Sequence, residues 1–209
     1  MDLNGRTALI TGCCGRLGSQ IALTIAELGG DLILLDQPKA KFDELTKKIN
    51  KISDVEISLI ECDLEDELSI KESLEQIIED REKLEVLINN AAFVGTSNLE
   101  GWVTSFEKQS PETWRRALEV NLTAPFVLVK SCLEALRSSG NGSIINIGST
   151  YGVGGAIMSL YEGTSMGMPA AYAASKGGLI QFTRWLSTVL APGIRVNSIS
   201  PGGIWRDQP

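Results

Sequence analysis

Short apolar segments alternate with longer helical patterns along the whole chain, and this alternation most restricts the folds open to it. The apolar segments are strand-length and almost continuously apolar, as strands buried on both faces are. They lie at 7–11, 31–36, 55–61, 84–89, 143–148 and 194–199. The helical patterns lie near 17–28, 39–51, 68–82, 111–137 and 170–190. This order predicts an α/β fold: a Rossmann-type, doubly wound parallel sheet with helices on both faces.

Length and composition fit one globular domain over residues 1–209. The chain is 43% hydrophobic and 22% charged, which is ordinary for a globular protein, and we find no repeat or linker. The formal charge of −7 argues against nucleic acid or an anionic membrane as a main partner. The first residues lack a basic segment followed by an apolar run, and no apolar run is long enough to span a bilayer. We therefore expect a cytoplasmic protein without a signal peptide.

The four cysteines show no CxxC spacing, and the chain contains no histidine. Most of them sit in or beside apolar patterns, so we expect buried, reduced thiols and no metal site. They are Cys13, Cys14, Cys62 and Cys132.

A glycine-rich loop follows the first apolar segment and leads directly into a helical pattern. Gly12, Gly15 and Gly18 permit a tight turn and let backbone N–H groups approach a pyrophosphate at the helix N-terminus. The second apolar segment ends at Asp36, which would accept hydrogen bonds from ribose hydroxyls and repel a 2′-phosphate. This favours NAD, although Arg16 could hold a 2′-phosphate and keeps NADP open.

Tyr172 and Lys176 are four residues apart in a helical pattern, so their side chains lie on one face. Lowering a tyrosine pKa from about 10 to neutrality requires roughly 4 kcal/mol. One cation at ~4 Å supplies about that much at an effective dielectric near 20. Without histidine, Tyr172 is the first candidate for proton transfer. The alternative is a half-buried tyrosine and a solvated lysine that merely share a face.

Several ordered motifs resemble those of the short-chain dehydrogenase/reductase family. Those motifs are Leu-Ile-Asn-Asn-Ala-Ala from Leu87, Val-Asn-Leu-Thr from Val120, Ile-Asn-Ile-Gly-Ser from Ile145, Tyr-Ala-Ala-Ser-Lys from Tyr172, and the run from Arg195 to Gly202. They cover essentially the whole chain in the family's order.

This resemblance implies a catalytic tetrad of Asn121, Ser149, Tyr172 and Lys176. Ser149 would orient the substrate oxygen, Tyr172 would exchange the proton, and Lys176 would hold the nicotinamide ribose. It also implies contacts to the dinucleotide from a wider set of residues. That set is Gly12, Gly15, Arg16, Leu17, Gly18, Asp36, Asp63, Leu64, Asn90, Ala91, Tyr172, Lys176, Pro201, Gly202 and Ile204.

The residues around Asn121 support its place in the tetrad. Pro125 has no N–H, so the Asn121 carbonyl lacks its donor four residues later and the helix should kink there. The family uses this backbone oxygen to hold a water that passes protons to the lysine. A polar helix cap with an incidental proline is the alternative.

The chain departs from the family pattern at three places. Its glycines are spaced Gly-x-x-Gly-x-x-Gly, as in the family's epimerases and dehydratases of nucleotide sugars. The segment between Ser149 and Tyr172 is long, and we expect it either to line the substrate pocket or to form a surface loop. Its run from Tyr161 to Met166 resembles reductases of flagellin and surface-sugar modification. Family members continue past the motif that ends at Gly202 with a further strand, whereas the sequence ends at Pro209. We therefore expect a sheet that lacks this last strand, in a fragment or a shortened protein.

Three functions remain open. The first is a nicotinamide-dependent oxidoreductase of a secondary alcohol or ketone, such as a sugar derivative. The second is an epimerase or dehydratase that retains its NAD, and the third is a dinucleotide-binding protein without turnover. The resemblance also implies a homodimer or homotetramer formed through the helices at 111–137 and 170–190.

Overall fold

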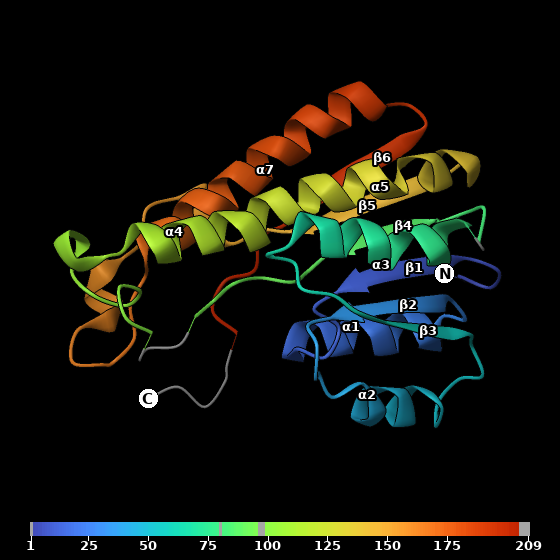
Figure 1. The fold of residues 1–209 in the computed structure, drawn as a ribbon, viewed down its shortest axis with the longest axis horizontal. Helices are drawn as coiled ribbons and strands as arrows, with labels where there is room; N and C mark the ends of the chain where they lie inside the picture. Colours follow the sequence, from blue (N-terminus) through green and yellow to red (C-terminus); the bar gives the residue numbers. More distant parts are fainter. Residues whose placement is uncertain (1, 80, 96–98, 205–209) are drawn as a thin grey trace.

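The computed structural model describes residues 2–79, 81–95 and 99–204. Within them, six parallel strands form one sheet in the order β3-β2-β1-β4-β5-β6 (Figure 1). The strands are β1 (Thr7–Thr11), β2 (Asp31–Asp36), β3 (Ile57–Glu61), β4 (Val86–Asn89), β5 (Gly142–Ile147) and β6 (Ile194–Ile199). The chain moves outward from β1 to β3, returns to the centre at β4 and moves outward again to β6. The predicted doubly wound α/β fold is therefore confirmed.

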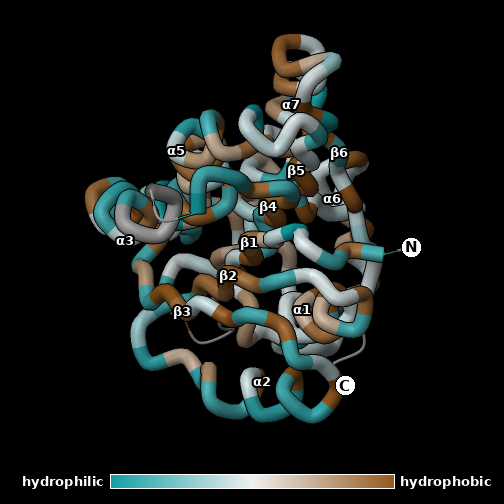
Figure 2. Tube along the Cα trace, turned by 90° about the vertical axis from the view of Figure 1, so that its right-hand side faces the viewer, coloured by the Kyte–Doolittle hydropathy of each residue, from teal (hydrophilic) through white to brown (hydrophobic). Residues whose placement is uncertain are grey.

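Helices cover both faces of the sheet (Figures 1 and 2). The main helices are α1 (Arg16–Glu27), α2 (Phe42–Ile49), α3 (Glu67–Glu79), α4 (Pro111–Leu118), α5 (Ala124–Ser138) and α7 (Ala170–Leu190). Alternate residues of β1 point to opposite faces: Leu9 joins a core with α3, α5 and α7, and Ile10 joins a core with α1 and α2. The inner strands β1, β2, β4 and β5 are mostly apolar because both of their faces are buried, whereas the edge strands β3 and β6 keep exposed residues.

The long helical pattern at 111–137 is interrupted in the structure. A π-helical turn, η2 (Glu119–Thr123), separates α4 from α5. Pro125 stands in the first turn of α5, and the Ala124 N–H donates to the Glu119 carbonyl, five residues back. A missing proline N–H commonly shifts helical hydrogen bonding in this way, so the irregularity predicted near Asn121 is present.

Three short helices were not predicted from the sequence. They are η1 (Phe106–Lys108), α6 (Thr150–Val153) and η3 (Met158–Tyr161). Each is too short for its hydrophobic period to stand out from a loop. Two of them, α6 and η3, lie within the long segment between Ser149 and Tyr172.

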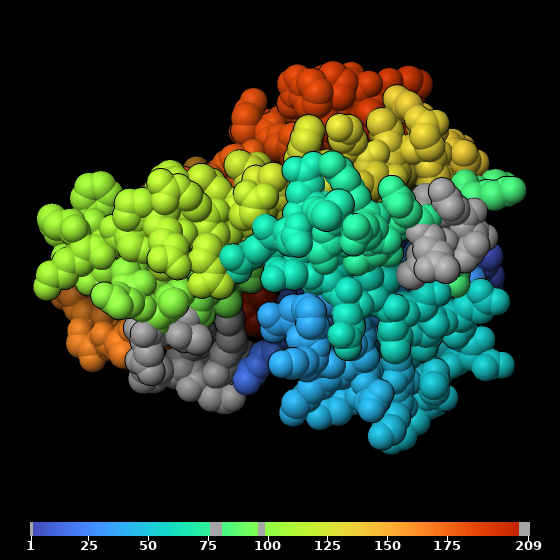
Figure 3. Space-filling view, viewed as in Figure 1, coloured from blue at the N-terminus to red at the C-terminus, as the bar shows by residue number. Residues whose placement is uncertain are grey.

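The order of the strands determines where a ligand can bind. Successive strands are added toward one edge of the sheet up to β3 and toward the other edge from β4 onward, so the strand order reverses between β1 and β4. Open α/β sheets bind ligands at such a point, outside the carboxyl ends of the strands. The molecular surface is hollowed between the blue N-terminal atoms and the green atoms of the middle segment (Figure 3). Of the helices in the described ranges, none has the length and apolar character needed to cross a bilayer.

Candidate active site

A cleft of about 1450 Å³ lies at the carboxyl ends of the central strands. The loops that follow β1, β2, β3, β4, β5 and β6 all contribute to its lining, together with the start of α7. Every residue predicted to contact the dinucleotide lines this cleft, from Gly12 to Ile204. Ser149 lines it as well. The fold therefore brings the distant sequence motifs together.

The glycine loop packs closely against its neighbours. Gly12 has a φ of +65°, and a Cβ there would come within 2.8 Å of the Ala91 Cα. A Cβ on Gly18 would collide with the Gly12 carbonyl oxygen and come within 2.8 Å of the Asn90 Nδ2. Gly15 caps α1 without any side-chain hydrogen bond, so the helix begins with bare backbone facing the cleft.

Asn90 holds this loop in place. Its Nδ2 donates to the carbonyl oxygens of Thr11 at 2.9 Å and Gly12 at 3.0 Å. The Thr11 hydroxyl oxygen in turn accepts from the backbone N–H groups of Asn90 and Ala91, both at 3.1 Å. The amide of Asn90 therefore binds the protein's own loop, and the residue lines the cleft beside it. The sequence motif located Asn90 but did not indicate this bracing contact.

Asp36 lies at the end of β2 beside the same loop. Its Oδ2 accepts from the Cys14 backbone N–H at 2.8 Å, and its Oδ1 accepts from the Gln37 N–H at 2.8 Å. Each carboxylate oxygen keeps a second lone pair for a ligand hydroxyl. Burial is the main cause that raises the pKa of the Cys13 and Cys14 thiols, and the Asp36 charge raises both further. Both thiols are free, as the sequence predicted.

One wall of the cleft is held by an ion pair that the sequence did not indicate. Arg116 of α4 donates from Nε and Nη2 to the Glu65 carboxylate, with its shortest contact at 2.8 Å. The Arg116 guanidinium also lies over the Phe93 ring, 4.7 Å from its centroid. Because Asp63 and Leu64 directly precede Glu65, this contact fastens the loop after β3 to α4. Partners this far apart in sequence leave no local pattern.

Lys176 is the most unusual residue of the cleft, because its side chain is only 1% exposed. Its ammonium donates to the Ile147 carbonyl at 2.7 Å and lies 5.9 Å from the centroid of the Tyr172 ring. Burial lowers the pKa of Lys176 to about 8, so the group is still mostly protonated at neutral pH. The predicted pairing of Tyr172 and Lys176 on one face of α7 is present.

Ser149 lies just beyond β5, where the chain enters α6. Its Oγ accepts from the Tyr151 N–H at 3.1 Å, which caps this short helix. The Thr150 N–H donates to the Pro201 carbonyl at 3.1 Å. This contact holds the loop after β6 beside Ser149, so the residues at 201–204 border the same part of the cleft.

The Asn121 side chain lies behind the cleft wall and is fully buried. Its Oδ1 accepts from the Phe93 N–H at 2.6 Å, and its Nδ2 donates to the Ser175 Oγ at 3.0 Å. Ser175 directly precedes Lys176. The side chain therefore joins the π-helical turn to α7 and to the loop after β4. The role expected of the Asn121 backbone carbonyl stays a prediction.

The long segment before α7 contributes its own residues to the cleft. Leu160, Tyr161, Met166 and Met168 line it, as one of the two alternatives for this segment predicted. The Tyr161 hydroxyl donates to the Tyr151 hydroxyl at 2.5 Å. Burial is the main cause that raises the pKa of Tyr161, followed by Tyr151 and then Tyr172. Tyr161 therefore stays protonated, and it stands close to Tyr172.

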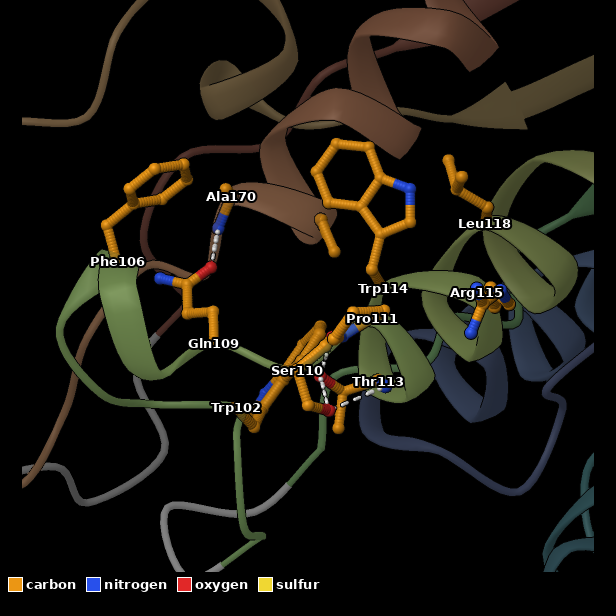
Figure 4. A pocket seen from close by; sticks show the side chains of 11 residues that line it. Trp102, Phe106, Gln109, Ser110, Pro111, Thr113, Trp114, Arg115, Leu118 and Ala170 are labelled. Atoms are coloured by element: carbon orange, nitrogen blue, oxygen red, sulfur yellow. Dashed lines mark hydrogen bonds between the residues drawn. The ribbon is translucent and has the colours of Figure 1, made fainter.

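A second, smaller pocket of about 440 Å³ lies where η1, α4 and α7 meet (Figure 4). There the Gln109 Oε1 accepts from the Ala170 N–H at 3.0 Å, which caps the start of α7. Trp114 stands at its edge and is 40% exposed. None of the predicted site residues lines this pocket.

Comparison with known proteins places the chain in a family. Residues 6–207 match the short chain dehydrogenase family. The chain is 33% identical to a 3-oxoacyl-[acyl-carrier-protein] reductase from Rickettsia conorii, over 99% of this chain and 76% of that protein. The chain therefore belongs to the short chain dehydrogenase family and is an oxidoreductase of that family.

Solved structures agree with this assignment. NAD⁺-bound xylitol dehydrogenase superposes with a TM-score of 0.83 at 29% identity, covering 98% of this chain and 74% of that one. A short chain dehydrogenase from Shigella flexneri complexed with NADP gives 0.83 at 27% identity, covering 96% and 78%. The narrower resemblance to flagellin or surface-sugar modification gains no support from these relatives.

Proposed function

We propose that this protein is a nicotinamide-dependent oxidoreductase that interconverts a secondary alcohol and a ketone. The observation that carries the proposal is the buried Lys176 ammonium, fixed by the Ile147 carbonyl beside Tyr172 in a cleft that Ser149 also lines. Burying an ammonium is costly, so a fold that positions one beside a phenol favours a use for it.

Each of the three side chains has a role that follows from its chemistry. The Tyr172 hydroxyl exchanges a proton with the substrate oxygen, because a neighbouring cation stabilises its phenolate form. The Ser149 hydroxyl donates a hydrogen bond to the same substrate oxygen and orients it. Lys176 holds the ribose next to the reacting ring. Asn121 fixes α7 through Ser175, and its backbone carbonyl is proposed to hold a proton-relay water.

The cleft fits a dinucleotide. The closely packed glycine loop places the N-cap Gly15 and the free backbone N–H groups of α1 at the cleft, which suits a pyrophosphate. Asp36 offers lone pairs to the adenosine ribose and opposes a 2′-phosphate, so we propose NAD as the preferred cofactor. Arg16 also lines the cleft and keeps NADP as the second choice. A bound nicotinamide supplies or accepts the hydride.

We propose a small, hydroxyl-bearing substrate such as a sugar or polyol derivative. The Tyr151 and Tyr161 hydroxyls bind each other beside Tyr172, and together they offer donors and acceptors to substrate hydroxyls. The relatives point both ways, since one is named for acyl-carrier-protein substrates and another for xylitol. Leu160, Met166 and Met168 supply the apolar part of the lining.

A kinetic assay tests the proposed reaction. Polyols, ketoses and 3-oxoacyl thioesters are offered with NAD(H) and NADP(H), and the absorbance of reduced nicotinamide is followed. We expect turnover with NAD(H) and a polyol or ketose. Tyr172→Phe should lower kcat by at least about 100-fold, the usual contribution of a general acid–base group. NADH binding, measured by fluorescence, should stay within a few-fold of wild type.

Other outcomes would separate the remaining alternatives. Turnover by Tyr172→Phe equal to wild type would refute the role of the phenol. Protein that carries NAD through purification and oxidises no added alcohol would favour an epimerase or dehydratase. NADH binding with no turnover of any substrate would favour a dinucleotide-binding protein.

A further inference from the structure

Three metal-ligating side chains meet at the adenosine end of the cleft, and the proposed reaction does not use their sulfur atoms. They are Cys13 and Cys14 of the glycine loop and Asp36 at the end of β2. Their ligand atoms all lie within 4.8 Å of one another, and the two Sγ atoms are 3.8 Å apart. In the part of the chain that the structure describes, no other such group of three is found.

The spacing of the two sulfur atoms matches what one metal ion requires. A tetrahedral Zn²⁺ with Zn–S bonds of about 2.3 Å separates its two sulfurs by about 3.8 Å. The sulfur pair therefore needs no rearrangement to become two ligands. A carboxylate oxygen is the third ligand, and water on the cleft side can complete the tetrahedron, as in sites with three protein ligands.

We propose that Cys13, Cys14 and Asp36 bind a thiophilic divalent cation of the zinc and cadmium class, and that this cation and the dinucleotide exclude each other. The second half of the proposal rests on the proposed function. The sequence predicts buried, reduced thiols and no metal site, because most of the cysteines sit in or beside apolar patterns and none shows a CxxC spacing. Asp36 supplies the missing ligand and comes from the next strand.

Softness of the ligands determines which cations bind. Two thiolates select zinc, cadmium or copper(I), whereas Mg²⁺ and Ca²⁺ require oxygen ligands. As the cation binds, each thiol gives up its proton to the solvent. Cys14 and Asp36 line the cleft, so a cation reaches the buried Cys13 sulfur from that side.

Mutual exclusion follows from the position of Asp36. The same carboxylate is proposed to accept hydrogen bonds from the adenosine ribose. Both of its oxygens already accept a backbone N–H, from Cys14 and Gln37. A coordinated cation would take one of the remaining lone pairs and place its water where the ribose hydroxyls are expected. The cation would thus act as an inhibitor at the cofactor site.

Titration of the apoprotein with Cd²⁺ tests the site directly. The ultraviolet charge-transfer absorbance of cadmium thiolate is followed, without cofactor or substrate. We expect saturation at one equivalent per chain. Cys14→Ser should lose the absorbance or weaken binding by at least about 100-fold, because removing a ligand costs more than removing a supporting group. Asp36→Asn should also weaken binding, and its single amide oxygen can keep only one of the two backbone hydrogen bonds that the carboxylate accepts.

Cys132→Ala is the matched control, because it removes a buried thiol that lies outside the cluster. It should bind Cd²⁺ like wild type. Circular dichroism confirms that each variant is folded. Equal Cd²⁺ binding by wild type and Cys14→Ser would overturn the site, as would a signal lost in Cys132→Ala instead.

A competition experiment tests the exclusion. NADH affinity is measured by fluorescence with and without one equivalent of Cd²⁺, and with Mg²⁺ for comparison. Cd²⁺ should weaken NADH binding at least tenfold in wild type and have no effect in Cys14→Ser. Equal NADH affinity with and without bound Cd²⁺ would overturn the exclusion. Failure of NADH to bind even without metal would refute the proposed function. The Cd²⁺ titration of the apoprotein would still decide whether the metal site exists.

Discussion

At the scale of single residues, the clearest feature is an ammonium group buried away from water. Lys176 is almost completely buried, and its ammonium donates to one backbone carbonyl. This hydrogen bond and the electron-rich face of Tyr172 offset part of the free energy lost when the ammonium leaves water. The rest of this desolvation penalty lowers the pKa of Lys176 to about 8.

This pKa predicts how stability depends on pH. The folded-state pKa is about 8 and the ordinary lysine value is 10.5, so between them the unfolded chain binds more protons than the folded one. Stability therefore rises as the pH increases through this window. From pH 7 to pH 10, Lys176 should contribute an increase of about 2–3 kcal/mol in the free energy of unfolding.

The contribution of Lys176 is isolated by a difference measurement. Urea unfolding of wild type and Lys176→Met is measured across this pH range, and the two curves are subtracted. The free energy of unfolding of wild type minus that of Lys176→Met should increase as the pH increases. If this difference stays constant or decreases, the ammonium is not desolvated as the structure indicates.

At the scale of elements, the glycine loop and α1 depend on an approach that only glycine permits. Gly18 lies in the first turn of α1, and an added Cβ there would press on the Gly12 carbonyl, the Asn90 amide and the Cys13 Cα. Two of these three contacts involve backbone atoms, which cannot move away without displacing the loop.

Gly18→Ala should therefore affect both stability and binding. We expect a loss of about 1–3 kcal/mol in the free energy of unfolding, as overpacking a core usually costs. NADH affinity should fall at least tenfold, because the displaced loop no longer presents its N–H groups to the pyrophosphate. Urea unfolding and fluorescence titration give the two values.

Gly155→Ala is the control, since a Cβ at that position meets nothing within 4 Å. It should leave stability and NADH affinity unchanged. Unchanged NADH affinity in Gly18→Ala would contradict the role given to the loop.

Periodicity predicted the main elements well, and several ends agree to the residue. The α7 helix spans Ala170–Leu190, and β1, β2 and β6 have the expected bounds. The elements that the sequence did not predict leave no mark on the hydrophobic pattern. Both α6 and η3 are single turns, and the π-helical turn at Glu119–Thr123 depends on shifted hydrogen bonds that leave the apolar pattern intact. Pro125 was the one local signal of that irregularity.

At the scale of the whole molecule, large apolar side chains remain exposed on the helices of one face. Phe126 of α5 is 51% exposed, and Trp185 of α7 is 58% exposed. Trp114 of α4 stands near the small pocket of Figure 4. The helices α4, α5 and α7 lie on the same side of the sheet in Figure 1. Exposed aromatic side chains on one face of a protein commonly mark interfaces between proteins.

We therefore predict that the protein forms a homodimer or homotetramer through this face. Trp185→Glu places a charge in the proposed interface, so it should shift the sedimentation coefficient toward that of the monomer. Ile52→Glu is the control, because Ile52 is also exposed, at 46%, but follows α2 on the opposite face. A monomeric wild type, or association that Trp185→Glu leaves unchanged, would contradict this prediction.

The sequence alone determined the fold class, the six strands, and the motif residues expected at the dinucleotide, all of which line the cleft. These properties are local or carried by contiguous motifs: alternation of apolar segments, a glycine loop before a helix, and a tyrosine and lysine one helical turn apart. Only the tertiary structure decided which partners those residues take. Four contacts join residues far apart in the chain. They are the hydrogen bond from Lys176 to the Ile147 carbonyl, the Glu65–Arg116 ion pair, the hydrogen bonds from Asn90 to the glycine loop, and the group of Asp36 with two cysteines. Such contacts depend on strand order and loop packing, which hydrophobic periodicity does not encode.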